Sequence, residues 1–207
     1  MKQGTLNIIL RHLPVLARMF GCSLVLLTAT ACSFQRISDV EFASVETVFV
    51  KGMFPPEEFE WDGYGEAPIQ LLKVLFSTKT DISSLAATQE YHITGNASFC
   101  GLRNGNQVRL GPTAIYLNEE RVSQRGPRLQ ENMKISTVYH TYLPLHRKEE
   151  TSPSIASPAF DLKTDPDDIC FRVHGGNMLG MTFHSNTVVI PKEAVTEALE
   201  KLVKRPE

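Results

Sequence analysis

The chain has 207 residues, of which 42% are hydrophobic and 21% are charged, and its net charge at pH 7 is −2. This length is sufficient for a domain with a substantial hydrophobic core. The 23 acidic residues outnumber the 21 basic ones. This balance argues against nucleic acid as a partner, because nucleic-acid-binding domains usually present a basic face.

The first segment, residues 1–31, has the pattern of a secretory signal peptide. It contains Lys2, Arg11 and Arg18 but no acidic residue, and every residue from Met19 to Ala31 is apolar or small. A helix that crosses a bilayer needs about 20 apolar residues. The run is therefore too short for a stable membrane span, but it fits the apolar region of a signal peptide.

The apolar run ends in Ala29-Thr30-Ala31-Cys32, which resembles the lipobox of bacterial lipoproteins. This resemblance implies cleavage before Cys32, a diacylglycerol thioether on its sulfur and acylation of the new amine. Several acyl chains together form a lasting membrane anchor. Ser33 follows where inner-membrane lipoproteins of Gram-negative bacteria typically carry aspartate, which favours the periplasmic face of the outer membrane. The alternative is an ordinary signal peptide that is cut nearby, with Cys32 incidental.

We therefore expect three parts: a lipoprotein signal peptide at 1–31, an acylated cysteine and polar tether at 32–40, and a β-rich periplasmic domain at 41–207. Removal of the signal peptide takes away Cys22, and if Cys32 is acylated, Cys100 and Cys170 remain as an even pair in an oxidising compartment, so we predict a disulfide between them. A catalytic or metal-binding thiol is the alternative. No Cys-x-x-Cys or Cys/His spacing supports it, and we expect neither a metal nor a cofactor.

The elements expected in chain order are mostly strands. Residues 42–52 alternate and are β-branched, which predicts a strand, and the proline-rich stretch 53–68 predicts a loop. Residues 69–87 are ambiguous, and the spacing of Leu71, Leu72, Leu75 and Phe76 favours a helix in the first half. Asn104-Gly105 between two β-like runs predicts a hairpin, because both residues tolerate positive φ. Residues 131–145 contribute a further strand.

The second half of the domain closes the predicted sheet. Residues 146–167 are charged and rich in proline, which predicts a long excursion. In the following strand, Ile169, Phe171 and Val173 face one way and Cys170, Arg172 and His174 the other, with a turn at Gly175-Gly176-Asn177. Residues 191–205 predict a helix that begins at Pro191. The fold class is mainly β: one antiparallel, β-sandwich-like domain with one or two helices, including a C-terminal helix.

The loop at 54–66 is the candidate for binding a partner, because acidic residues alternate there with Phe59, Trp61 and Tyr64, and Asp62 lies among them. Aromatic anchors with a charged rim are typical of protein-binding hot spots. The alternative is that the rings pack beneath the loop and the acids are solvated. His174 and His184 are the best candidates for catalysis or metal binding, although two ligands are too few for a metal. Arg103 and Arg109 could bind an anion, but that segment is mainly a hairpin.

Three functions remain open, and none has a motif in the residues after Cys32. The first is a non-catalytic lipoprotein that binds another envelope protein, in one form an immunity protein against a toxic effector in the periplasm. The second is a structural or assembly lipoprotein, similar to a pilotin, with a stable partner. The third is an envelope hydrolase that uses His174 and His184. The first two rest on analogy with a loose class of anchored domains.

Overall fold

The computed structural model describes residues 35–50, 69–123, 125, 136–147 and 158–203. Contacts within the chain divide it into two units, Met1–Phe34 and Gln35–Glu207. All of the described residues lie in the second unit.

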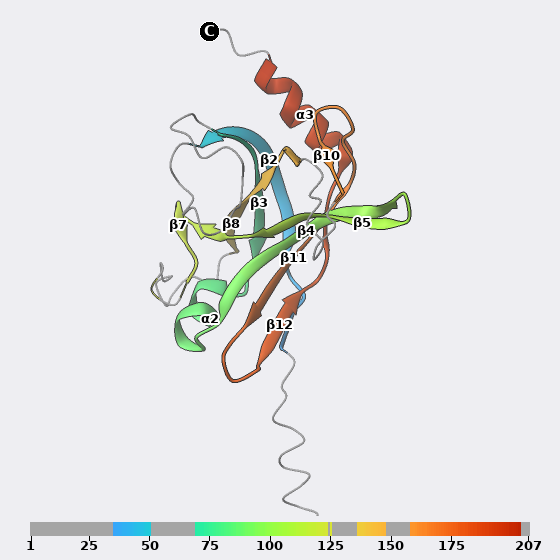
Figure 1. The fold of residues 1–207 in the computed structure, drawn as a ribbon. Helices are drawn as coiled ribbons and strands as arrows, with labels where there is room; N and C mark the ends of the chain where they lie inside the picture. The colour runs from blue at the N-terminus through green and yellow to red at the C-terminus, as the bar shows by residue number, and fades with distance from the viewer. Residues whose placement is uncertain (1–34, 51–68, 124, 126–135, 148–157, 204–207) are drawn as a thin grey trace, which may run out of the picture. The chain divides into compact units, whose positions relative to one another are not determined.

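Two main sheets form the domain (Figure 1). In the first, which we call sheet A, β1, β12, β11, β4 and β5 follow one another and β13 also pairs with β11; in the second, sheet B, the order is β2, β3, β8, β6, β7. The strands of sheet A are β1 (Gln35–Ile37), β4 (His92–Arg103), β5 (Asn106–Thr113), β11 (Ile169–Gly176), β12 (Thr182–Ser185) and β13 (Val188–Ile190). The strands of sheet B are β2 (Glu41–Val50), β3 (Ile69–Thr78), β6 (Ile115–Leu117), β7 (Glu120–Arg121) and β8 (Thr137–Pro144).

Neighbouring strands are antiparallel except for β1 and β12, which are parallel. A third, two-stranded sheet pairs β9 (His146–Arg147) with β10 (Phe160–Asp161). The mainly β, sandwich-like class predicted from the sequence is confirmed.

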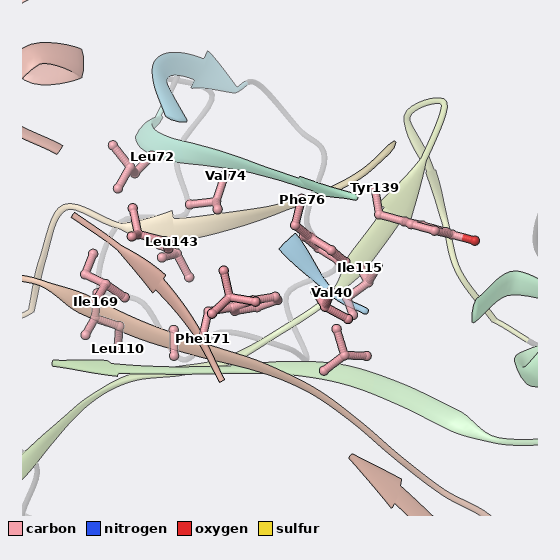
Figure 2. Packing of buried hydrophobic residues seen from close by; sticks show 14 of the residues in the cluster. Val40, Leu72, Val74, Phe76, Leu110, Ile115, Tyr139, Leu143, Ile169 and Phe171 are labelled. Carbon is pink, nitrogen blue, oxygen red and sulfur yellow. The ribbon is translucent and has the colours of Figure 1, made fainter. Parts of the chain in front are cut away.

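The core lies between sheets A and B, where the inward side chains of both interdigitate (Figure 2). The ring of Phe76 on β3 lies 5.1 Å from that of Phe171 on β11 and 5.9 Å from that of Tyr139 on β8. All three side chains are fully buried. On β11 buried and open positions alternate, so Ile169, Phe171 and Val173 face this core as the sequence pattern predicted.

Two helices complete the described fold, α2 (Ile82–Thr88) and α3 (Lys192–Val203). The Asp81 carboxylate caps α2 by accepting a hydrogen bond from the Ser84 N–H at 2.9 Å. Helix α3 packs against β2, where Thr47 Oγ1 donates to the Ala198 carbonyl at 3.0 Å and Val195 is buried. The predicted C-terminal helix is therefore confirmed, with Pro191 directly before its first residue.

The helix predicted for the first half of residues 69–87 is wrong, because residues 69–78 form β3. This strand is central in sheet B and pairs with β2 on one side and β8 on the other. Leu72 and Phe76 face the core, whereas Leu71 belongs to a second apolar cluster on the outer face of the sheet. Apolar residues on both faces of one strand produced the spacing that resembled a helix. The helix of this region is α2, further along.

The hairpin predicted at Asn104-Gly105 is confirmed as the turn between β4 and β5, with φ values of 51° and 78°. The turn predicted at Gly175-Gly176-Asn177 is displaced, because both glycines belong to β11 and residues 177–181 connect it to β12. A Cβ on Gly175 would collide with the ring of Phe183. The glycine at 175 therefore serves a close approach between neighbouring strands.

The polar tether predicted at 32–40 is shorter in the structure, because residues 35–37 form β1 at the edge of sheet A. Asp39 is also fixed to the domain: it accepts hydrogen bonds from Thr78 Oγ1 at 3.0 Å and from the Lys79 N–H at 2.6 Å. The described part of the domain thus begins at Gln35. The segment of three residues was too short for a pattern of alternating side chains to indicate a strand. Its partner strand, β12, lies far away in sequence.

Candidate functional site

A groove of about 630 Å³ lies on the outer face of sheet A, across β4, β5 and β11. We call it the basic groove, because its lining includes Arg109 and Arg172 and, among the described residues that line it, no carboxylate. The lining residues are Asn96, Ala97, Ser98, Phe99, Cys100, Gln107, Arg109, Gly111, Pro112, Cys170, Arg172 and Thr187. It is an open groove rather than an enclosed cavity.

The groove follows from an irregularity in the β4–β5 hairpin. The register between these strands shifts between Ala97 and Ser98 and again between Ser98 and Leu102. Gly111, which lies opposite Ala97, has a φ of 114° that favours glycine. Bulges of this kind bend the strand and increase its twist. The outer surface of sheet A is therefore not flat at this point.

The predicted disulfide is confirmed, and it borders the groove. Cys100 on β4 and Cys170 on β11 are bonded, with their Cα atoms 4.9 Å apart. Arg172 is held beside it because its Nε donates to Thr187 Oγ1 at 2.6 Å. That bond uses only one of the five guanidinium donors. Arg109 is exposed on β5, so two cationic side chains flank a floor of backbone, proline and disulfide.

The two predicted histidines are brought together by the structure, as direct partners across β11 and β12. Arg36 on β1 is the register partner of His184 on the other side. His174 is exposed and His184 is half-buried. Within the described ranges, no group of three or more His, Cys, Asp or Glu side chains is placed to hold a metal ion.

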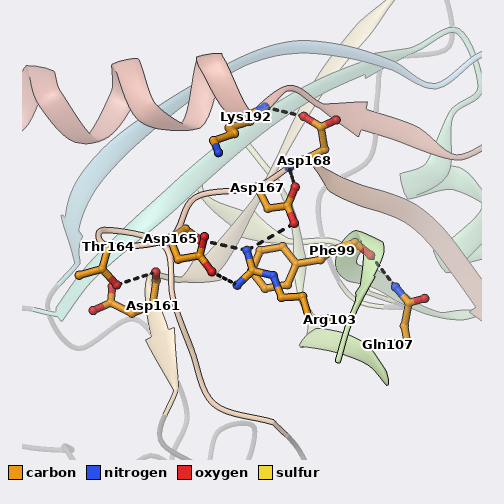
Figure 3. Close-up of polar contacts among 9 residues, drawn as sticks. All are labelled: Phe99, Arg103, Gln107, Asp161, Thr164, Asp165, Asp167, Asp168 and Lys192. Atoms are coloured by element: carbon orange, nitrogen blue, oxygen red, sulfur yellow. Dashed lines mark hydrogen bonds and ion pairs between the residues drawn. The ribbon is translucent and has the colours of Figure 1, made fainter. Parts of the chain in front are cut away.

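The carboxylates closest in sequence to His174 form contacts with other residues (Figure 3). Asp167 forms an ion pair with Arg103 at 3.4 Å, and Asp168 Oδ1 accepts a hydrogen bond from the Lys192 N–H at 2.7 Å, at the start of α3. Both lie at the opposite end of β11 from His174, roughly 20 Å away at the rise of an extended strand. The histidine pair therefore gains no acidic partner from this segment.

Arg103 has a structural role, in contrast to an anion-binding one. Its guanidinium lies 3.7 Å from the centre of the Phe99 ring and pairs with the Asp165 carboxylate at 3.0 Å (Figure 3). These contacts tie the β4–β5 hairpin to the segment that precedes β11. Of the two arginines considered in the sequence, only Arg109 lines the basic groove.

A polar cluster on the outer face of sheet B was missed by the sequence analysis. Glu119 lies at its centre: Lys73 Nζ donates to Oε1 at 2.7 Å and the Tyr142 hydroxyl donates to Oε2 at 3.0 Å. His140 Nε2 lies 3.4 Å from the same Oε2 without forming a hydrogen bond of good geometry. The rings of Tyr116, His140 and Tyr142 pack together at centroid distances of 5.3 to 5.4 Å.

Burial and these contacts shift the pKa values of the cluster. The hydrogen bond from the Lys73 ammonium holds the pKa of Glu119 below its usual value. Burial lowers the pKa of His140 and raises that of Tyr142. Both oxygens of Glu119 are occupied by side chains of the domain itself, so the cluster serves to hold the β6–β7 turn on the sheet. Two members of the cluster, His140 and Tyr142, lie on the strand expected at residues 131–145, and no further signal was present in the sequence.

The remaining predicted site residues, Cys32, Phe59, Trp61, Asp62 and Tyr64, lie outside the described residues. The segment that contains the last four connects Val50, at the end of β2, to Ile69, at the start of β3. Val50 is buried in the outer apolar cluster of sheet B, together with Tyr116 and Tyr142.

Comparison with family models, with curated proteins and with solved structures finds no match to this chain. In the part of the chain that the structure describes, neither helix has the length and apolar character needed to cross a membrane.

Proposed function

We propose that this chain is a bacterial lipoprotein, held at the periplasmic face of the outer membrane by acyl chains on Cys32, and that its β-sandwich is a non-catalytic domain that binds another envelope protein. The anchor is supported by the sequence of residues 1–32, with its basic start, its apolar run and its lipobox. The basic groove carries the binding part of the proposal.

The groove suits an extended, acidic segment of a partner protein. It is open along sheet A, so a peptide can lie across it without entering a closed cavity. Arg109 and Arg172 are placed to meet carboxylates, with which guanidinium groups form strong, bidentate hydrogen bonds. No carboxylate among the described lining residues competes for them. The Arg172–Thr187 bond limits the motion of one guanidinium, which reduces the entropy lost on binding.

The positions of the acidic residues support the proposal that the domain is non-catalytic. Hydrolysis through His174 and His184 with an aspartate of the preceding segment as the orienting group would need Asp167 or Asp168 beside an imidazole. Asp167 and Asp168 are bound to Arg103 and to the start of α3 instead. Among the described residues, the Glu119 cluster is occupied by its own internal contacts.

Two kinds of partner fit an anchored binding domain. An immunity protein would bind a toxic enzyme in the periplasm and abolish its activity. An assembly lipoprotein would bind a component of an envelope machine, and loss of the lipoprotein would mislocalise that component. We favour the immunity protein, and the partner's own activity in the presence and absence of the domain separates the two.

The test is affinity capture of envelope proteins on the immobilised, oxidised protein. We expect one partner at a fixed stoichiometry, and its loss from the Arg109→Glu/Arg172→Glu variant because both cations of the groove are reversed. The matched control is Lys79→Glu/Lys192→Glu, which changes the net charge equally at two exposed residues outside the groove lining. The control should retain the partner.

A third variant, Phe59→Ala/Trp61→Ala, tests the aromatic loop as the alternative contact. Loss of the partner from this variant alone would move the binding site from the groove to the loop. Equal capture by all variants, or no stoichiometric partner at all, would contradict the proposed binding function.

A further inference from the structure

The connection between β11 and β12 exposes two adjacent apolar side chains. We call residues 177–180 the hairpin tip. In it the side chain of Met178 is 103% exposed and that of Leu179 is 84% exposed, the two highest values among the large hydrophobic residues of the described chain. Transfer of apolar side chains such as these from water into an apolar environment is favourable in free energy.

Asn177 forms the hydrogen bonds that shape the tip. The Asn177 side-chain oxygen accepts hydrogen bonds from the N–H groups of Leu179 and Met181, both at 3.1 Å. Its amide nitrogen donates to the Gln89 carbonyl at 3.2 Å, which attaches the tip to the segment after α2. Gly180, with a φ of 79°, allows the chain to return into β12. The exposure of Met178 and Leu179 is therefore built into a defined turn.

The strand order places this tip at the membrane end of the domain, if Cys32 is acylated. Strand β1 runs parallel to β12, and Gln35 is the register partner of Phe183. The beginning of β1 and the beginning of β12 therefore lie at the same end of sheet A, which is the end that carries the hairpin tip (Figure 1). Gln35, the first described residue after Cys32, and the hairpin tip therefore share one end of the sheet.

The lengths also agree. Cys32 lies three residues before Gln35, so the connecting chain reaches at most about 10 Å. Met178 lies three residues beyond Gly175, which is the register partner of Phe183, so the tip extends about 10 Å past the level of Gln35 at the rise of a strand. The tip can therefore reach the depth at which Cys32 is held.

The polar residues at this end of sheet A suit contact with a lipid surface. Arg36, His184 and His174 form one row across β1, β12 and β11, and His92 lies opposite Gly176 near the tip. Glu90 is the acidic residue next to this region in the described chain, and it already takes part in an interaction. The Arg36 guanidinium, beside polar imidazoles and apolar side chains, is complementary to anionic phospholipid headgroups and the acyl region below them.

We propose that Met178 and Leu179 insert into the bilayer interface beside the acylated Cys32, so that the domain is attached to the membrane at two points. This inference rests on the proposed lipid anchor. Two attachment points fix the orientation of the sandwich: the hairpin tip faces the membrane, and α3, at the other end of the domain in Figure 1, faces the periplasm. The basic groove then opens sideways, where an envelope protein can approach.

The test uses the full mature lipoprotein in vesicles of phosphatidylethanolamine and phosphatidylglycerol, part of which carries brominated acyl chains. Leu179→Trp is introduced with Trp61→Phe, so that the indole at the tip is the only one in the chain. Bromine quenches an indole that enters the acyl region. The matched control is Val189→Trp in the same background, because Val189 is 49% exposed and lies opposite Cys170, away from the tip.

We expect strong quenching and a blue-shifted emission for the indole at position 179, and neither for the indole at position 189. Unquenched emission at both positions, from protein that floats with the vesicles, would overturn the insertion and leave the lipid anchor intact. Quenching at both positions would also overturn it, because the whole face would then lie on the membrane. Protein that does not float with the vesicles would contradict the anchor itself.

Discussion

Removal of the Cys100–Cys170 disulfide should lower the free energy of unfolding without changing the fold. The bond closes a loop with a sequence separation of 70 residues. On the chain-entropy account, a bond across a loop of this length stabilises the folded state by about 4 kcal/mol, because it restricts the unfolded chain. The Cys100→Ser/Cys170→Ser variant tests this figure.

The folded state itself should tolerate the change. Cys100 is exposed and Cys170 is half-buried, so the two substitutions remove little from the core. Strands β4 and β11 are paired along their length, from Ile169 opposite Phe99 to Gly176 opposite His92, and this ladder does not depend on the bond. Nearly all of the effect should therefore arise in the unfolded ensemble.

Urea unfolding followed by circular dichroism measures the difference. With a slope of about 2 kcal/mol per molar, the midpoint should fall by about 2 M, and the melting temperature should fall by roughly 8–16 °C for a domain of this size. Each single variant should match the double variant, and a reducing agent should have no effect on the double variant. Equal midpoints for the oxidised protein and the double variant would refute the reasoning.

Four further predictions concern the core and the Glu119 cluster. Gly175→Ala should destabilise the domain by about 1–3 kcal/mol because its Cβ meets the Phe183 ring, whereas Gly176→Ala, whose nearest contact is 3.6 Å, should cost less than half as much in the same urea assay. Phe76→Ala should cost about 3–5 kcal/mol, because it removes a fully buried ring between the sheets, and a loss below 1 kcal/mol, measured by calorimetry, would contradict the packing. Because burial lowers the pKa of His140, the unfolded chain binds a proton near pH 6.5 that the folded domain binds only at lower pH, so stability should decrease as the pH falls below 6.5; His140→Gln should flatten this part of the stability profile, and an unchanged slope would show that His140 is not the group. Because the pKa of Glu119 is lowered in the folded domain, its ionised carboxylate should stabilise the fold fully above pH 4.5. This contribution to the free energy of unfolding should be lost as the pH falls through the folded pKa, and it should be absent from the Glu119→Gln variant.

The features that could be predicted from the sequence depend on neighbours close in the chain or on simple pairing rules. Alternation along residues 169–173 identified the inward face of β11 correctly, and Asn104-Gly105 identified its hairpin because few other residues adopt positive φ. The Cys100–Cys170 bond followed from the count of cysteines once Cys22, in the predicted signal peptide, and Cys32 were set aside.

The errors have a common physical cause, which is pairing between segments far apart in the chain. β3 has apolar residues on both faces because a second apolar cluster covers the outside of sheet B, and nothing within residues 69–78 reveals that cluster. β1 is only three residues long and is a strand because β12, near the other end of the chain, pairs with it. Gly175 suggested a turn, but its small size serves the Phe183 ring on the neighbouring strand.

One of the candidate sites could be expected from the sequence, and two could not. The histidine pair could be expected from the spacing of two strands, and the structure places His174 and His184 opposite each other on β11 and β12. The basic groove could not be expected, because Arg109 and Arg172 come from strands that lie on either side of β4. The Glu119 cluster joins residues from β3, β8 and the β6–β7 turn, and its charge pairing becomes visible only when these elements meet.

The most direct test of the proposed binding function is site-specific photo-crosslinking in the cells that make the protein. A photoreactive amino acid at Asn96, an exposed residue of the basic groove, is compared with one at Val138, which is 49% exposed on the other sheet. We predict a covalent adduct with one envelope protein at position 96 and none at position 138. An adduct at position 138 alone, or no protein adduct at either position, would contradict the account.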